Sequence, residues 1–120
     1  MTGSIQSDSW AAGLDIRPVE GGWVMPLSGR HMNFLDGAHG GALFSLAEVA
    51  MRERAAEDGP DPVLLDAHLA LTAGGSEGDV FTARTEPVKV GRTLGVYRTT
   101  VTRGDGKVVG EFTGTVRFAE

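Results

Sequence analysis

The sequence predicts an α+β fold in which a mainly antiparallel β-sheet curls around one helix. Three observations support this: one long segment is rich in helix formers, about six shorter segments have the residue pattern of strands, and glycine-rich turns separate them. We expect residues 1–120 to form a single domain, because the length and the 41% hydrophobic content suit one ordinary core. Residues 1–7 are small and polar and are expected to form a loose tail.

The N-terminal part of the chain predicts small elements. Residues 8–13 are expected to form a short helical turn with Asp8 or Ser9 as its N-cap. Residues 14–18 and 23–27 predict two strands, and the Glu-Gly-Gly sequence between them indicates a hairpin turn. Residues 28–38 are expected to form a loop, in which Asp36-Gly37 is a strong turn signal.

Residues 40–56 predict the one long helix. The stretch is rich in Ala, Leu, Glu and Arg, and Asp58-Gly59-Pro60 after it is a sequence that stops helices. Its first half is apolar nearly all round, interrupted by Ser45 and Glu48. That pattern indicates a helix buried inside the domain.

Four strands are predicted after the helix, at residues 63–71, 79–88, 93–102 and 108–118. In the first and the last of them apolar and polar residues alternate, so each is expected to have one covered face. The residues predicted to be covered are Val63, Leu65, Ala67, Leu69 and Leu71 in the first strand, and Val108, Phe112, Val116 and Phe118 in the last.

Composition and missing motifs exclude several function classes. The net charge of −5, without a basic face, argues against a nucleic-acid partner, and the absence of cysteine removes disulfides and cysteine nucleophiles. No stretch approaches the roughly 20 apolar residues that span a bilayer, and the N-terminus lacks a signal-peptide pattern, so a cytoplasmic location without a membrane partner is expected. The three histidines form no HExxH or His-x-His pattern, so no metal site is expected, and neither GxSxG nor a P-loop is present.

The residues that remain for chemistry lie just before and within the helix. Asn33 is followed by a glycine-rich turn, and His39, Gly40 and Gly41 lead into the segment that carries Glu48. The first N–H groups of a helix lack intrahelical partners and lie at the positive end of its dipole. They can stabilise an oxyanion that forms on a carbonyl carbon under attack, and Gly40 and Gly41 are the candidate donors.

Glu48 can supply the second part of such a reaction. A carboxylate in an apolar helix segment should have a raised pKa, and it can act as a general base on water or attack the carbonyl carbon directly. Gly40 and Glu48 are eight residues apart, which is roughly 12 Å along the helix and about 80° around it. One Glu side chain cannot close that gap, so a reaction that uses both residues requires a dimer with two shared sites.

Each residue also has a purely structural interpretation. The glycine-rich turn alone is typical of a loop that enters a helix. Glu48 can pair with Arg52 one turn further along the helix. His39 alone can be a structural hydrogen-bonding residue, and His31 and His68 are expected to be structural or exposed. Only the joint arrangement points to catalysis.

The segment HMNFLDGAHGGALFSLAEVA, residues 31–50, resembles the signature of hotdog-fold thioesterases of the phenylacetate-degradation (PaaI) type. In that family an Asn, a Gly and a His-Gly-Gly turn precede an apolar helix with Asp or Glu nine residues after the histidine. Here Asn33 lies six residues before His39, and Glu48 lies nine residues after it. A weaker resemblance extends over residues 62–118.

The resemblance implies a hotdog fold, with a curved antiparallel sheet wrapped around one long central helix, and a homodimer that commonly pairs into a tetramer. It implies hydrolysis of an acyl-CoA without a separate cofactor, because coenzyme A is part of the substrate. The Gly40 N–H would polarise the thioester carbonyl, and Glu48 of the opposing subunit would be base or nucleophile. Asn33 would place the water or the thioester, and His39 would hold the loop or assist at the carbonyl.

The chain departs from the family pattern in the strand after the helix, where Leu64 replaces a common polar residue. Residues 72–75 replace a usual Arg-Pro-Ala run, which leaves the coenzyme A contacts of that region unassigned. Lys89 and Arg92 are the basic residues expected near the nucleotide. The aryl or medium-chain acyl group is expected to contact apolar residues from one set, namely Met25, Phe34, Leu35, Phe44 and Met51.

Three functions follow from these observations. An acyl-CoA thioesterase is favoured, because a sensor has no need of a carboxylate inside a buried helix. A non-catalytic acyl-CoA binding or sensing domain is the alternative, and Leu64 leaves room for it. A hotdog dehydratase or hydratase is disfavoured, because those enzymes use a different arrangement of histidine and acid.

Overall fold

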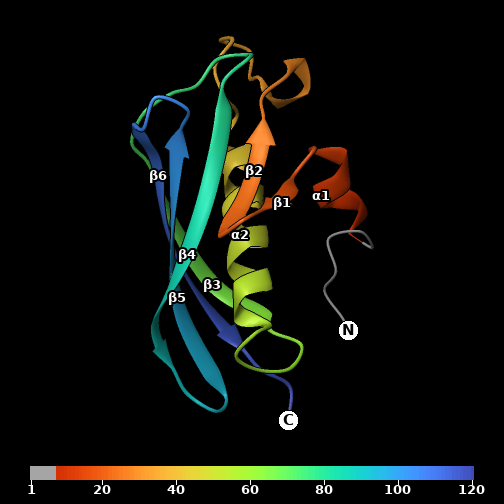
Figure 1. The fold of residues 1–120 in the computed structure, drawn as a ribbon, viewed down its shortest axis with the longest axis vertical. Coiled ribbons are helices and arrows are strands. Elements are labelled where there is room, and N and C mark those ends of the chain that lie inside the picture. Colours follow the sequence, from red (N-terminus) through yellow and green to blue (C-terminus); the bar gives the residue numbers. More distant parts are fainter. Residues whose placement is uncertain (1–7) are drawn as a thin grey trace.

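The computed structural model describes residues 8–120 and confirms the predicted α+β architecture (Figure 1). The helices are α1 (Ser9–Gly13) and α2 (Gly40–Ala55), with a short 3₁₀ helix, η2 (Gly29–His31), between them. The strands are β1 (Arg17–Val19), β2 (Gly22–Pro26), β3 (Val63–Leu71), β4 (Val80–Val90), β5 (Leu94–Arg103) and β6 (Val108–Arg117). The predicted loose tail at residues 1–7 lies outside the described residues.

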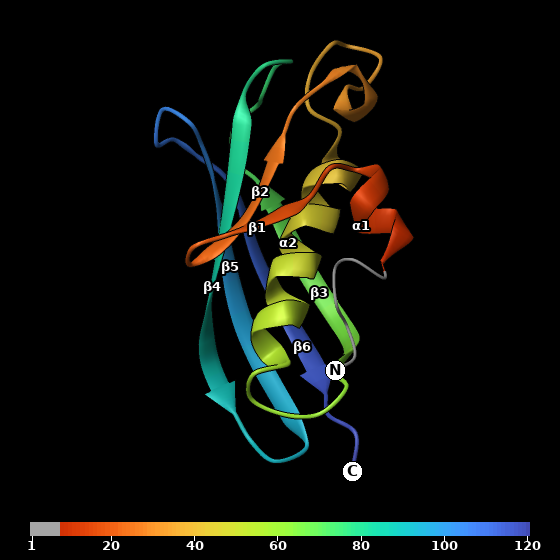
Figure 2. The same ribbon diagram turned by 45° about the vertical axis from the view of Figure 1, so that its right-hand side comes forward.

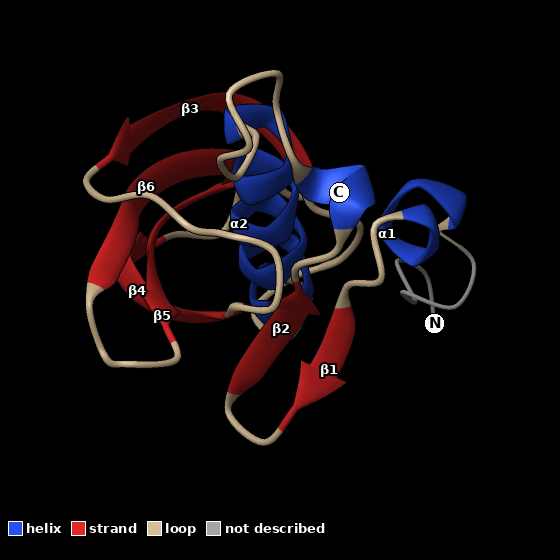
Figure 3. Ribbon diagram, turned by 90° about the horizontal axis from the view of Figure 1, so that it is seen from above, coloured by secondary structure: helices blue, strands red, loops and turns tan. Residues whose placement is uncertain are grey.

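The six strands form one antiparallel sheet in the order β1-β2-β4-β5-β6-β3. Seen from above, this sheet curves around α2, which lies along its concave side (Figure 3). The order makes β1 and β3 the edge strands and sets β4, β5 and β6 against the helix. Among the described residues, no helix is long and apolar enough to cross a membrane.

The core lies between α2 and the middle of the sheet. Leu46 and Met51 of the helix are fully buried, as are Phe81, Tyr97 and Phe112 of the strands opposite. Burying side chains of this size contributes about 1.5–3 kcal/mol each, before the entropy of ordering them is subtracted. The prediction of a long buried helix is therefore confirmed, and the helix ends one residue earlier than expected.

The predicted covered face of β3 is wrong for three of its five residues. Those three, Val63, Leu65 and Leu71, are more than half exposed, at 57%, 53% and 58%. A bulge between Leu64 and Asp66 shifts the alternation, so Leu64 packs against the core while its neighbour Leu65 does not. The edge position of β3 leaves its outward residues uncovered within one chain.

A similar shift changes the first residues of β6. Val109 is buried and Val108 is 36% exposed, the reverse of the prediction. The ladder between β5 and β6 has a bulge there, because Val101 pairs with Gly110 and Thr102 with Val108. The remaining predicted residues of that strand are buried as expected, and these are Phe112, Val116 and Phe118.

Candidate active site

Asn33 holds the loop in front of α2. Its Oδ1 accepts hydrogen bonds from the N–H groups of Leu35 and Gly37 at 2.8 and 3.0 Å, and its own N–H donates to the Gly37 carbonyl at 2.7 Å. These bonds make an Asx-type turn in which Asp36 has a positive φ of 59°. The Asn33 side-chain amide group Nδ2 has no acceptor within residues 8–120, so it can still donate to a ligand.

Two histidines fix the position of this loop. His31 is buried, with its Nε2 2.7 Å from the Leu14 carbonyl oxygen, and its Nδ1 accepts from the Ser28 N–H at 2.9 Å. The N–H of His39 donates to the His31 carbonyl at 2.7 Å. His31 is therefore a structural residue, and it ties the start of α2 to the preceding loop.

The first turn of α2 has one occupied and one unoccupied N–H group. His39 is the N-cap residue, and its Nδ1 accepts from the Gly41 N–H at 2.9 Å. This corrects the expectation that both glycines offer oxyanion donors, because the Gly41 N–H is already used. Within the described part of the chain the Gly40 N–H has no acceptor, and it lies at the positive end of the helix dipole.

Glu48 lies on α2, two turns beyond Gly40, with its side chain 22% exposed. Its Oε2 accepts from the Arg52 Nε at 3.2 Å. The Glu48–Arg52 ion pair, which the sequence offered as a purely structural role for Glu48, is therefore present. Burial raises the pKa of the Glu48 carboxyl, and the Arg52 guanidinium offsets only part of that rise. The pairing therefore does not remove the property that suits this carboxylate to proton transfer.

Asp8 lies beside Arg52 and Glu48, although no sequence pattern connects it with them. Its Oδ2 accepts from the Arg52 Nη2 at 2.8 Å, between residues 44 positions apart in sequence. Its Oδ1 accepts from the N–H groups of Trp10 and Ala11, which confirms Asp8 as the N-cap of α1. No local sequence signal joins Asp8 to Arg52, because their contact depends on how α1 packs against α2.

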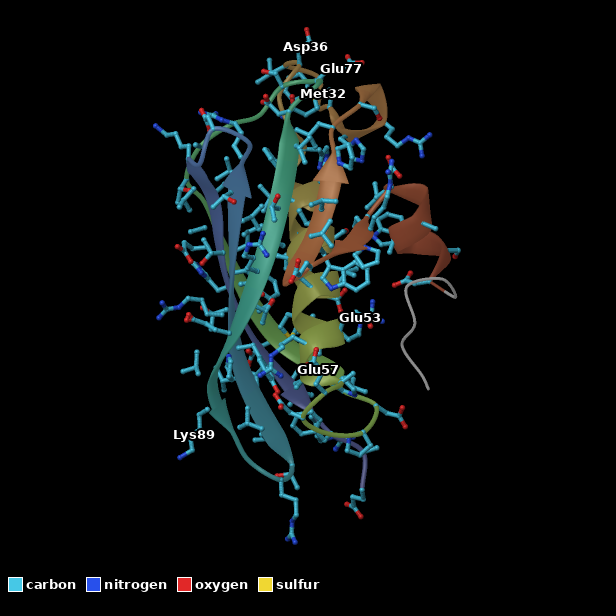
Figure 4. The ribbon with its side chains drawn as sticks, viewed as in Figure 1. Met32, Asp36, Glu53, Glu57, Glu77 and Lys89 are labelled. Atoms are coloured by element: carbon cyan, nitrogen blue, oxygen red, sulfur yellow. The ribbon has the colours of Figure 1, made fainter. Side chains whose placement is uncertain are left out.

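The other predicted substrate contacts are dispersed. Phe34 is 92% exposed at the tip of the loop, whereas Phe44 packs against the core. Lys89 and Arg92 are exposed on the hairpin formed by β4 and β5. Lys89 lies toward the opposite end of the 43 Å long molecule from Asp36 (Figure 4). Of the other acyl-pocket candidates, Met25 and Met51 are fully buried and Leu35 is exposed.

Two cavities in the described part of the chain are lined by residues other than the predicted site residues. A cavity of about 460 Å³ lies between the β1–β2 hairpin and α2, and its lining includes Trp23, Glu53 and Glu57. Glu53 lies in the C-terminal half of α2, and Glu57 lies just after the end of that helix (Figure 4). A second cavity of about 270 Å³ lies beside the C-terminus. Within residues 8–120, no three His, Asp or Glu side chains are grouped as a metal site.

Comparisons with known proteins agree with the fold. The family model "Thioesterase superfamily" matches residues 36–110, more than half of the chain. A Deinococcus radiodurans protein named "Putative esterase" is 38% identical over 90 residues, which cover 74% of this chain and 61% of that relative, less than two thirds of its length.

Two solved structures extend the comparison to three dimensions. The PaaI protein of the E. coli phenylacetic acid degradation operon has a TM-score of 0.90 and 27% identity, over 96% of this chain and 87% of PaaI. A Streptococcus pneumoniae thioesterase solved with coenzyme A has a TM-score of 0.77 and 28% identity, over 80% and 77% of the two chains. The chain therefore belongs to the thioesterase superfamily and has the hotdog fold of its PaaI-type members.

Proposed function

We propose that this protein hydrolyses acyl-CoA thioesters to the free acid and coenzyme A. The observation that carries the proposal is the unoccupied Gly40 N–H at the positive end of α2, beside a loop held by Asn33 and His39. An N–H in that position can donate to a carbonyl oxygen as negative charge develops on it. Glu48, whose pKa is raised by burial, supplies the carboxylate.

The reaction uses these groups in a defined order. The Gly40 N–H donates to the thioester carbonyl oxygen, and the Asn33 amide donates to the water or the thioester. Glu48 of the partner subunit takes a proton from the water while the water oxygen bonds to the carbonyl carbon. The C–S bond then breaks, and the coenzyme A thiolate takes up the proton. Direct attack by Glu48, giving an anhydride that water opens, yields the same products.

The proposed site is shared between two subunits. Gly40 and Glu48 of one chain are roughly 12 Å apart along α2, and neither of the described cavities contains them. A homodimer, alone or paired into a tetramer, would bring the first turn of one α2 to the Glu48 of the other. Lys89 and Arg92 can then approach the coenzyme A phosphates of the site only from the partner, since the hairpin that carries them lies toward the far end of their own chain.

The names of two relatives support the proposed substrate class. The S. pneumoniae thioesterase was solved with coenzyme A, and the E. coli PaaI protein comes from a phenylacetic acid degradation operon. We therefore propose an aryl- or medium-chain acyl-CoA. A non-catalytic acyl-CoA binding domain is the second candidate, and the observation that favours it is the pairing of Glu48 with Arg52.

Thiol release from acetyl-, hexanoyl-, benzoyl- and phenylacetyl-CoA tests the proposal. We expect the native chain to hydrolyse at least one of them and Glu48→Gln to lower kcat by about 10²–10⁴-fold. Glu53→Gln is the matched control, because burial also raises the pKa of Glu53, five residues further along the same helix. Equal activity of the native chain and Glu48→Gln would contradict the mechanism. Tight binding of acyl-CoA without turnover would establish the binding domain instead.

A further inference from the structure

The short helix α1 lies beside α2 (Figure 2). Gly41, Ser45, Glu48 and Arg52 follow one another at spacings of four, three and four residues, so they share one face of α2. α1 contacts that face on both sides of Glu48. Three residues before it, the Trp10 Nε1 donates to the Ser45 Oγ at 2.8 Å, and the Ser45 hydroxyl donates to the Gly41 carbonyl at 2.9 Å.

Four residues after Glu48, Arg52 is held from two sides. Its Nη2 donates to the Asp8 Oδ2 at 2.8 Å, and its Nε donates to the Glu48 Oε2 at 3.2 Å. The side chains of Asp8, Glu48 and Arg52 are only 22–23% exposed, so these contacts are partly shielded from water. Asp8 is itself fixed, because its other oxygen caps α1.

Arg52 meets Glu48 through a single hydrogen bond. A guanidinium tends to bind a carboxylate with two parallel hydrogen bonds. Here the Arg52 Nη2 donates to Asp8, so Glu48 receives only the bond from Nε, the longer of the two contacts. Glu48 Oε1 accepts no hydrogen bond within residues 8–120. One oxygen of Glu48 is therefore oriented and the other is left available.

We propose that Asp8, acting through Arg52, is a positioning residue that restricts Glu48 to one ion-pair contact and keeps its second oxygen available for the reaction. This inference rests on the proposed function, in which Glu48 is base or nucleophile. Without Asp8, Arg52 is free to close a two-bond pair with Glu48 and occupy both oxygens. The N-terminal helix is thereby a part of the site, although it carries none of the reacting groups.

Arg52 and Asp8 affect the pKa of Glu48 in opposite directions. Arg52 lowers the pKa of Glu48, whereas the negative charge of Asp8 raises it; Glu53 is the other carboxylate that shares the field of Arg52 and Asp8. Removing Arg52 should therefore raise the pKa of Glu48. Removing the charge of Asp8 should lower it, both directly and because Arg52 then pairs more fully with Glu48.

Asp8→Asn and Arg52→Met test the inference. Asn caps helices as well as Asp does, so Asp8→Asn removes the acceptor for Arg52 while α1 keeps its cap. Trp10→Phe is the matched control, because it removes the other polar contact of α1 and leaves the Asp8–Arg52 pair intact. Arg52→Lys keeps the positive charge without the rigid guanidinium fork, and it remains informative if Arg52→Met folds poorly.

Two measurements are made on each variant. The first is the pH profile of kcat and kcat/KM with phenylacetyl-CoA, or with the best thioester of the four-compound panel. The second is the titration of the Glu48 carboxyl carbon by ¹³C NMR, with its signal assigned by its absence in Glu48→Gln. The titration reports on Glu48 directly, so it does not depend on turnover.

We expect Asp8→Asn to lower kcat on the plateau of the pH profile by about tenfold or more. The acid limb of the profile, where activity falls as Glu48 takes up a proton, should not move to higher pH. Arg52→Met should move that limb and the Glu48 titration upward by about one pH unit. Trp10→Phe should leave both the pH profile and the Glu48 titration unchanged. A plateau kcat of Asp8→Asn within twofold of native, with Glu48→Gln inactive, would overturn this inference alone. Undiminished activity of Glu48→Gln would overturn the proposed function, and the positioning role with it.

Discussion

The two ends of α2 differ in how their backbone groups are satisfied. At the C-terminal end, the carbonyls of Arg52, Arg54 and Ala55 all accept hydrogen bonds from residues 56–59. Asp58 then accepts from the Arg54 guanidinium at 2.9 Å and from the Tyr97 hydroxyl at 2.7 Å. At the N-terminal end, His39 caps one N–H, and the Gly40 N–H has no acceptor in the described chain.

The C-terminal end of α2 therefore stabilises the fold, whereas its N-terminal end is suited to a reaction. Unsatisfied backbone groups at a helix end cost stability unless water or a ligand meets them, so a closed end favours the folded state. An end that keeps one donor free on a well-ordered loop is suited to a ligand oxygen. Substitutions at the two ends should therefore affect different properties, activity at one and stability at the other.

Among substitutions at the two ends of α2, Gly40→Pro should have the largest effect, and it should act on activity. Proline removes the N–H, and it is tolerated at the first position of a helix. His39 before it has φ −70° and ψ 131°, the extended conformation that precedes proline. We expect kcat to fall by about 10²–10³-fold, as when one oxyanion donor is removed, measured as thiol release.

Gly40→Ala is the matched control for that substitution. It keeps the N–H and adds a Cβ 3.1 Å from the terminal Cδ1 of Leu71, a flexible side chain that can move. We expect most of the activity to remain. Equal loss in both variants would show that the space around Gly40, and not its N–H, limits the reaction.

Tyr97→Phe should have the next largest effect, and it should act on stability alone. The Tyr97 hydroxyl is buried, and its loss removes a hydrogen bond to a carboxylate at the closed end of α2. We expect the free energy of unfolding to fall by about 1.5–3 kcal/mol at pH 7, measured by denaturant titration. Thiol release should stay within a factor of two of native, and a large loss of activity would contradict the separation of the two ends.

The effect of Tyr97→Phe should also depend on pH. The Tyr97 hydroxyl first, and then Arg54, hold the pKa of Asp58 below its usual value. A carboxyl with a depressed pKa in the folded state contributes stability above its unfolded pKa of about 3.9, and that stability is lost as the pH falls through the folded value. The difference between native and Tyr97→Phe should therefore shrink below about pH 4.

His39→Ala should have the smallest effect and tests the role of the cap at the reactive end. Loss of an N-cap acceptor costs about 1 kcal/mol, which we expect as a fall in thermal stability. His39→Asn should restore that stability, because Asn caps well. If activity returns together with stability in His39→Asn, His39 only holds the loop; if activity stays low, His39 also assists at the carbonyl.

The fold was predictable from the sequence because its main signals are local. The composition of residues 40–56 predicts a buried helix, and Asp58-Gly59-Pro60 predicts where it stops. The outward faces of β3 and β6 were not predictable from alternation. The ladder of each strand contains a bulge, and one extra residue puts the side chains on its two sides out of register with a simple alternation.

The candidate site likewise has features that the sequence determined and features that only the tertiary structure decided. The sequence by itself determined that a glycine enters the helix at Gly40 and that Glu48 lies in an apolar segment, because both depend on spacing along one element. Only the tertiary structure decided that His39 occupies the Gly41 N–H and that Asp8 holds Arg52 beside Glu48. Those contacts depend on side-chain direction and on the packing of α1 against α2, which no local pattern encodes.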